Sequence, residues 1–422
     1  MRNIIVNNTE IKISRRTHLL ILLILPVAFL ILAFLFDTPA HILSGLYEIV
    51  LTPDTLLTDY LAIGGFGATL LNVSLIALIN IFIIYKLNIQ INGAVIAALF
   101  TLMGFSFFGK SIFNIWAMYL GGFIYVKYHK ILFEQIIVVI MFSTCLAPIV
   151  SQFSFFAGLP LPYGIILGLL FGVIWGFIIT PLSSNMSKIH GGYNLYNAGF
   201  TAGCFGTLVY SLMKGSGINI QHESILSYEY NELFRNLLLV YFILLIIIGY
   251  SINNKSFKGY AKAFNYTGKL ITDYTQLIGH GLTFINMGIM GLICMVFVYI
   301  ANGSFNGPII GAVFTVVGFS SFGNNPKNSI PLMAGVFLGG MLRIWDLQTT
   351  PVIIAGIFST TLAPIAGKYG TCAGALAGFL HLFTVMNIGV IYGGTNLYNN
   401  GFSGGLVASI LVPLFESFKK EE

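Results

Sequence analysis

Residues 191–200 read Gly-Gly-Tyr-Asn-Leu-Tyr-Asn-Ala-Gly-Phe, and residues 393–402 read Gly-Gly-Thr-Asn-Leu-Tyr-Asn-Asn-Gly-Phe. The two ten-residue segments, called the repeated motif below, agree at eight positions. Such agreement within one chain indicates internal duplication, which decides the architecture before local structure is considered.

The duplication extends over nearly the whole chain. Leu-Leu-Thr-Asp-Tyr ending at Tyr60 recurs 214 residues later as Leu-Ile-Thr-Asp-Tyr ending at Tyr274. Further matched pairs are Thr69 and Thr283, Asn72 and Asn286, Asn92-Gly93 and Asn306-Gly307, Gly-Phe-Ser at 104–106 and 318–320, and the segments 143–148 and 359–364. The spacing falls to 202 at the repeated motif, which predicts a longer connection around Ser183 to His190 in the first copy.

Composition places both copies in a membrane. The chain has 422 residues, of which 57% are hydrophobic and only 8% charged, whereas a soluble domain carries about 25% charged residues. Apolar runs of roughly 17 to 25 residues recur, the length that spans a bilayer. We therefore expect an all-α integral membrane protein whose surface contacts lipid.

Each copy is predicted to contain about seven apolar helical segments. They lie near 17–36, 61–85, 93–108, 112–127, 131–150, 160–181 and 194–213, and near 236–252, 275–301, 307–322, 330–344, 350–366, 371–391 and 396–415. The third segment of each copy has about 16 residues, or ~24 Å. It ends in Phe-Gly, so it either crosses completely or forms a half-helix in a re-entrant hairpin.

Lysine and arginine predict the orientation. The N-terminal tail holds four of them, the loop 37–60 holds none, and the matched loop in the second copy holds Lys255, Lys258, Lys262 and Lys269. Equivalent loops therefore lie on opposite sides, as in inverted-topology repeats. The predicted order is a cytoplasmic tail (1–16), repeat 1 (17–215), a linker (216–235), inverted repeat 2 (236–416) and a cytoplasmic tail (417–422). This multi-pass arrangement in the cytoplasmic membrane places 16 of the 20 Lys and Arg residues inside.

Inverted repeats favour a transporter or channel, with the pathway at the interface of the repeats. The scarcity of matched charge within the apolar segments favours a small neutral or zwitterionic solute. The alternative is a non-transporting membrane scaffold or sensor. A coupling cation and a homo-oligomer remain open.

Other function classes have little support in the sequence. No cofactor, metal or nucleic acid is predicted. Gly-Phe-Ser-Gly-Gly at 401–405 fits G-x-S-x-G but lies in an apolar helix, whereas a nucleophile elbow needs a preceding strand. An enzyme is therefore not expected.

A repeated Gly-Gly-x-Asn-Leu-Tyr-Asn-x-Gly-Phe motif in a chain of this size resembles an uncharacterised family of duplicated prokaryotic membrane proteins. That resemblance implies a membrane location and no particular substrate. In plan the chain is also similar to inverted-repeat proteins such as urea transporters, an analogy of fold alone.

The repeated motif supplies the first candidate pathway residues, which are Asn194, Tyr196, Asn197, Asn396, Tyr398 and Asn399. They stand at the start of an apolar helix, where free N–H groups and amide side chains suit a polar solute. Helix capping and close packing through small residues explain the same pattern.

Further candidates flank the third segment. Ser106 and Ser320 end that segment, and Asn72 and Asn286 lie within the preceding one. A helix that stops within the membrane must line a cavity or be buried in protein. Lys110 and Lys327 follow closely, either as pathway cations or as residues that snorkel to the interface.

Asp59 and Asp273 are the clearly matched acids. Their Thr-Asp-Tyr context favours helix capping at the interface. If they are buried, they are instead candidates for coupling transport to protons or Na⁺.

Overall fold

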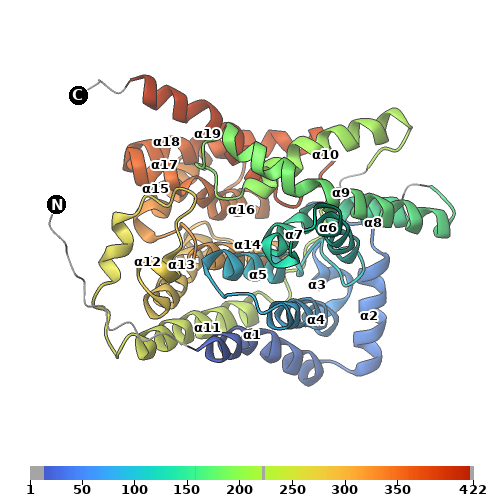
Figure 1. Ribbon diagram of the computed structural model, residues 1–422, viewed down its shortest axis with the longest axis horizontal. Helices are drawn as coiled ribbons and strands as arrows, with labels where there is room; N and C mark the ends of the chain where they lie inside the picture. The colour runs from blue at the N-terminus through green and yellow to red at the C-terminus, as the bar shows by residue number, and fades with distance from the viewer. Residues whose placement is uncertain (1–13, 157, 221–223, 419–422) are drawn as a thin grey trace.

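The computed structural model describes residues 14–156, 158–220 and 224–418, which form helices, 3-10 turns and loops, with two isolated β-bridges (Figure 1). The first copy contains α1 Arg15–Phe36, α2 Pro39–Leu51, α3 Tyr60–Ile63, α4 Gly65–Lys86, α5 Gly93–Phe105, α6 Trp116–His129, α7 Ile137–Ser143, α8 Ala147–Phe155, α9 Leu161–Ile189 and α10 Asn197–Gly215. The second contains α11 Asn231–Ile252, α12 Tyr274–Leu277, α13 His280–Ile300, α14 Gly307–Phe319, α15 Pro326–Gly340, α16 Thr350–Phe358, α17 Ala363–Tyr369, α18 Thr371–Ile388 and α19 Asn399–Ser417. The prediction of an all-helical protein is confirmed.

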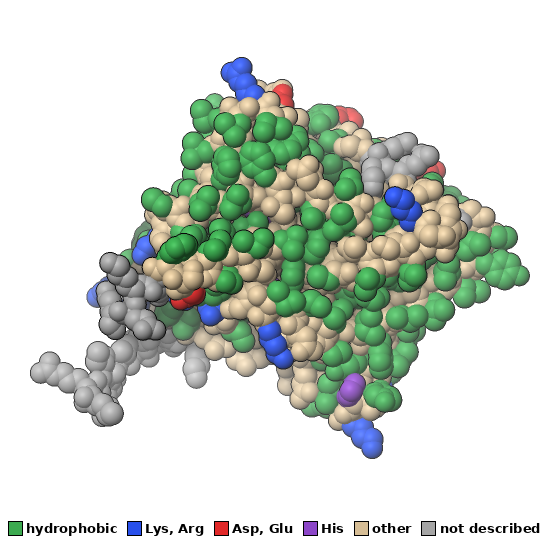
Figure 2. All heavy atoms as spheres, turned by 90° about the horizontal axis from the view of Figure 1, so that it is seen from above, with side chains coloured by type: hydrophobic (Ala, Val, Ile, Leu, Met, Phe, Trp, Pro, Cys, Tyr) green, Lys and Arg blue, Asp and Glu red, His purple; other side chains and the backbone are tan. Residues whose placement is uncertain are grey.

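Eight stretches in the described ranges are long and apolar enough to cross a membrane, and they fall into four matched pairs. The most apolar parts of α1, α9, α11 and α18 are only 33% buried, whereas those of α4, α7–α8, α13 and α16–α17 are 72–89% buried. The former therefore form an outer layer and the latter an inner one. Hydrophobic side chains cover much of the surface in Figure 2, as expected where a helical surface faces lipid.

One sequence-based boundary is wrong, and two of the predicted segments contain an internal break. Helix α9 continues to Ile189, so the extra residues of the first copy lengthen a helix and do not form a longer connection. The segments predicted near 131–150 and 350–366 are each divided by a 3-10 turn. Pro148 and Pro364 begin the helices that follow, where the missing proline N–H costs no hydrogen bond.

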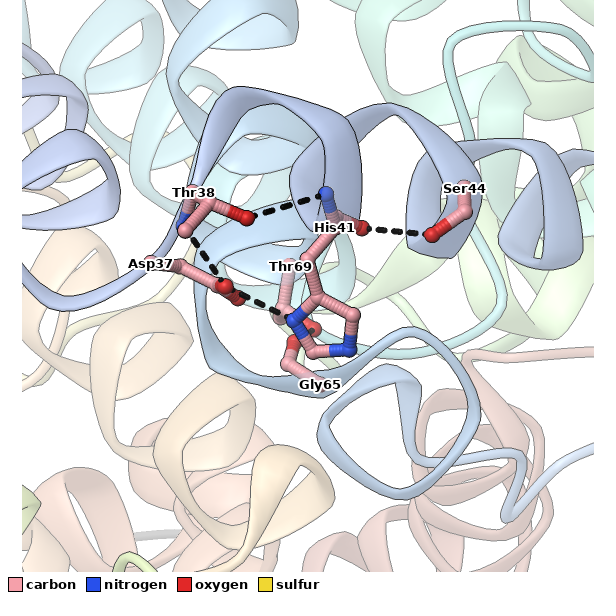
Figure 3. Close-up of polar contacts among 6 residues, drawn as sticks. All are labelled: Asp37, Thr38, His41, Ser44, Gly65 and Thr69. Carbon is pink, nitrogen blue, oxygen red and sulfur yellow. Dashed lines mark hydrogen bonds and ion pairs between the residues drawn. The ribbon is translucent and has the colours of Figure 1, made fainter.

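The loop predicted at 37–60 contains an additional helix, α2. Thr38 accepts a hydrogen bond from the His41 amide, and the His41 ring lies 2.7 Å from the Asp37 carboxylate (Figure 3). Gly45 permits close contact with Gly64, because a Cβ at Gly45 would lie 2.1 Å from the Gly64 carbonyl oxygen. The corresponding part of the second copy forms the 3-10 helix Tyr260–Asn265 instead.

Helices α5 and α14 lie together in the middle of the molecule (Figure 1). Each has 13 residues, about 20 Å, which is too short for a complete crossing. Gly104 contacts Gly311 while Gly318 contacts Ala97, so the two helices run in opposite directions. All residues of α14 and all but Ala94 of α5 are buried.

The matched aspartates join these helices across the copies. The Asp59 carboxylate accepts hydrogen bonds from the amides of Leu61 in its own copy and Gly307 at the start of α14. Asp273 in turn accepts from Gly93 at the start of α5, at 3.1 Å. The N-terminus of each buried helix is therefore capped by a carboxylate from the other copy. This carboxylate accepts hydrogen bonds from the free amide groups and interacts favourably with the positive end of the helix dipole.

Substituting Gly104 with alanine tests the contact between α5 and α14. A Cβ at this position would lie 2.5 Å from the Gly311 carbonyl oxygen. We expect Gly104→Ala to destabilise the fold by about 1–3 kcal/mol, as overpacking does, and to lower the melting temperature in detergent. The control is Gly215→Ala, because a Cβ added at Gly215 would meet nothing within 4 Å. Equal melting of both variants would contradict the close contact.

Candidate functional site

Two cavities occupy equivalent places in the two copies. The first cavity has a volume of about 360 Å³ and the second, here called the central cavity, about 200 Å³. Eight lining residues of the first cavity have matched counterparts lining the central cavity. These pairs are Leu56 and Leu270, Phe108 and Phe322, Ile354 and Val138, Phe358 and Phe142, Val385 and Ser183, Leu397 and Leu195, Asn399 and Asn197, and Asn400 and Ala198.

The central cavity also lies where the copies meet. Both members of four matched pairs line it, namely Thr101 and Thr315, Phe105 and Phe319, Phe142 and Phe358, and Tyr196 and Tyr398. Phe358 and Asn400 line both cavities, so these two side chains stand between them.

Three of these matched pairs are aromatic, and their six residues line the central cavity. We call them the aromatic cluster: Phe105, Phe142, Tyr196, Phe319, Phe358 and Tyr398. Their contacts repeat between the copies. The Phe105 and Tyr398 ring centroids lie 4.7 Å apart, and those of Phe319 and Tyr196 lie 4.5 Å apart. The Phe105 ring is stacked on Phe358 with centroids 5.9 Å apart. All six rings line the central cavity, and Phe358 also lines the first cavity.

The backbone of the repeated motif binds each copy to the other. The Leu195 amide donates to the Thr361 carbonyl, and the Leu397 amide donates to the Cys145 carbonyl. The Asn194 side chain donates to the Gly401 carbonyl at 2.8 Å. In the same way Asn396 donates to Gly199, at 3.0 Å. Neither Asn194 nor Asn396 lines either of the two cavities, and their assignment to the pathway stays a prediction.

The other four of the six candidate pathway residues in the repeated motif line a cavity. Tyr196, Tyr398 and Asn197 line the central cavity, and Asn399 lines the first. The Asn197 amide donates to Ser183 at the end of α9 and contacts the His190 ring. The hydrogen bonds hold this amide on the cavity wall. The motif thus combines the two interpretations of its sequence, because some of its residues pack the interface and others face a cavity.

The side chains of Asn72 and Asn286 donate hydrogen bonds to backbone carbonyls at the C-terminal ends of α5 and α14. The Asn72 side chain donates to the carbonyls of Ser106 and Lys110, at 2.8 and 2.9 Å. Asn286 donates to the carbonyls of the matched residues Ser320 and Asn324. None of Asn72, Asn286, Ser106 and Ser320 lines either cavity. Their assignment to the pathway remains a prediction, with their polar groups already engaged in the fold.

Lys110 and Lys327 both follow the third segment closely, but they are not matched, because Asn324 stands at the position equivalent to Lys110. Lys327 is exposed and donates to the Phe264 carbonyl. Lys110 is fully buried, and its ammonium donates to the Tyr398 hydroxyl at 2.7 Å. Lys110 therefore does not snorkel to an interface.

Sequence reasoning missed several cavity residues. Thr101 and Thr315 are matched at the spacing of 214 and could have been found from it. Asn400 could not, because Ala198 stands at the matched position. Phe358 was hidden among many apolar residues, since a repeated phenylalanine is more often part of the core.

Asp54 is another buried acid that the comparison of copies could not reveal, because Gly268 stands at its matched position. It lies in the loop between α2 and α3, outside the spanning helices. Its carboxylate accepts hydrogen bonds from Tyr60, Asn114 and Ser151 at 2.7–3.0 Å. Burial raises the pKa of Asp54 to about 7, and the three hydrogen bonds oppose this effect.

Comparison with known proteins identifies a family but no activity. Residues 38–215 and 252–417 match a family described as protein of unknown function (DUF1576). No curated protein matches the chain, and no solved structure does either.

Removing the Asn72 amide tests its role at the end of α5. In Asn72→Leu the carbonyls of Ser106 and Lys110 lose their donor while remaining buried. Each unsatisfied group costs about 1–3 kcal/mol, so the melting temperature should fall markedly. Asn387→Ala is the control, because its exposed side chain bonds only within its own helix. Similar melting temperatures of the two variants would show that the Asn72 side chain does not stabilise the end of α5.

The buried Asp54 predicts a pH dependence of stability. Its pKa of about 7 in the fold exceeds the value of about 3.9 in an unfolded chain. The folded state therefore binds the proton more tightly, and stability falls as pH rises through about 7. Melting curves between pH 5 and 8 should show this fall in the wild type and a smaller one in Asp54→Asn. Identical pH profiles would contradict the assignment.

Proposed function

The chain belongs to the DUF1576 family, and we propose that this duplicated membrane protein moves a small polar solute across the cytoplasmic membrane. The observation that carries the proposal is the pair of equivalent cavities that share Phe358 and Asn400 in their walls. A duplicated scaffold needs no cavities at matched places, whereas a pathway through the repeat interface does. No chemical reaction on the solute is proposed.

Inverted repeats give the proposal its mechanism. In support, α5 and α14 run in opposite directions, and matched aspartates cap them reciprocally. Two copies inserted in opposite orientations can exchange conformations, so that a site between them opens to one side and then to the other. The aromatic cluster is the barrier that would move in that exchange.

The present conformation corresponds to one of these states. The central cavity reaches Leu270, beside the lysine-rich loop that is expected to be cytoplasmic. The first cavity reaches Thr55, beside the loop that lacks Lys and Arg. We therefore assign the central cavity to the cytoplasmic side and the first cavity to the external side, separated by Phe358.

The walls suit a solute with a few polar groups. Thr101 and Thr315 offer hydroxyls, and Asn197 and Asn400 offer amides, among predominantly apolar side chains. Binding sites of this kind use a few polar groups for orientation and apolar groups for contact. Asp59 and Asp273 remain candidates for coupling, although the fold already uses both as helix caps.

Labelling of single cysteines tests the pathway directly. In a chain whose four native cysteines are replaced by alanine, Ile354→Cys lines the first cavity, and Val138→Cys lines the central cavity at the matched position. We expect a membrane-impermeant thiol reagent to modify Ile354→Cys from outside and Val138→Cys from inside. Val240→Cys is the control, because it lies on the outer helix α11 with 65% of its surface exposed and should face lipid.

Two outcomes would contradict the proposal. Reaction of both cavity variants from one side only would exclude cavities that open in opposite directions. Reaction of neither would favour a closed, non-transporting scaffold or sensor. Reaction of Val240→Cys would show that the reagent does not discriminate between cavity and lipid-facing positions.

A further inference from the structure

Lys110 is a buried lysine that the fold leaves without an anionic partner. Its side chain is fully buried in the segment after α5. Among the described residues no Asp or Glu oxygen lies within ion-pair distance of its ammonium. A buried charge normally requires a partner of opposite charge. Polar groups that lie inside a membrane protein without a structural explanation usually have a functional role.

The Lys110 side chain does not line the central cavity itself, but it packs against two aromatic rings that do. Its ammonium stands 4.7 Å from the ring centroid of Tyr398 and 5.1 Å from that of Phe105, both of which line that cavity. Its only hydrogen bond to a described residue is to the Tyr398 hydroxyl. An ammonium has three N–H donors, so two of the three are available to a ligand that reaches it past these rings.

The matched position in the second copy shows the same incomplete bonding. Asn324 is fully buried beside Tyr196, the counterpart of Tyr398. Neither the nitrogen nor the oxygen of its amide makes a hydrogen bond of standard geometry to a described residue, and its remaining polar contact is with the Tyr196 side chain. Buried polar groups are almost always hydrogen-bonded. Both positions beside the central cavity therefore hold polar groups that the fold does not satisfy.

We propose that the solute of the central cavity carries one carboxylate, which binds the Lys110 ammonium and the Tyr398 hydroxyl. The proposal rests on the proposed function and specifies its substrate class. An ammonium and a phenol hydroxyl both donate to carboxylate oxygens, and bonds to an ionised acceptor are the stronger ones. The aromatic cluster provides the surface for a small apolar body.

The uncharged Asn324 side chain gives the site a direction. A carboxylate is bound at the Lys110 end, and the remainder of the solute extends toward Tyr196 and Asn324. An amide there accepts or donates a hydrogen bond. A strictly neutral solute does not match this arrangement, whereas a monocarboxylate does, and a zwitterion remains compatible through its own carboxylate.

Paired carboxylates and amides test the charge requirement. The probes are butyrate with butyramide and benzoate with benzamide, added to purified wild-type protein in detergent, with equal sodium chloride as the salt control. A ligand that binds only the folded state raises the melting temperature. We expect a concentration-dependent rise with at least one carboxylate and none with its amide. In Lys110→Asn the affinity should be at least tenfold weaker.

Matched variants separate charge from folding. Lys110→Asn should fold, because asparagine occupies the equivalent position in the second copy, and Lys110→Met serves if it does not. Lys110→Arg should retain binding, and Lys327→Gln, which removes an exposed lysine, should behave as the wild type.

The inference is overturned if amides bind as tightly as carboxylates, if the carboxylate effect survives in Lys110→Asn, or if no carboxylate raises the melting temperature. Its failure is distinguishable from failure of the proposed function, because cysteine labelling of the two cavities needs no ligand. Labelling from opposite sides without carboxylate binding would retain a pathway for another class of solute.

Discussion

The fold depends on two carboxylates, one from each copy, that each cap a helix of the other copy. Asp59 and Asp273 satisfy the buried N-termini of α14 and α5 across the boundary between the copies. Without them, amide groups at the centre of an apolar molecule would remain unpaired, at about 1–3 kcal/mol each. Neither α5 nor α14 is long enough to reach both membrane surfaces, so the copies are interdependent. A single copy would expose the N-terminus of a half-helix to lipid, where no water can solvate it.

The same reciprocal principle governs the repeated motif. Asn194 and Asn396 bond to the backbone of the opposite copy, and Gly199 and Gly401 allow the chains to approach closely. These contacts place Tyr196 and Tyr398 beside one cavity, together with Phe105 and Phe319 from the ends of the half-helices. The elements that hold the copies together thus also position the residues between which a solute would pass.

Much of this architecture could be predicted from the sequence, because duplication repeats each structural requirement. The matched Asp, Asn and Ser positions marked the caps and breaks of α5 and α14, and the apolar runs marked the spanning helices. The length of α9 was missed, since Gly, Pro and Ser near its end resembled a connection and packing overrode their low helix propensity. The burial of Lys110 was also missed, because one charged side chain after a helix end carries no signal of depth. Cavities depend on which apolar side chains fail to fill space, which no residue pattern records.

Departures from the duplication therefore carry as much information as the matches. In the alignment of the two copies, Asn324 stands at the position equivalent to Lys110, Ala198 at that of Asn400, and Gly268 at that of Asp54. All three residues without a match are polar and lie in or beside the cavities or the segment that follows α5. A scaffold that must adopt two nearly equivalent conformations benefits from similar halves. A solute with two different ends does not, and a site that binds it in one orientation must break the symmetry locally. Lys110 and Asn400, which lie beside and in the wall of the central cavity, supply the local asymmetry that such a site requires.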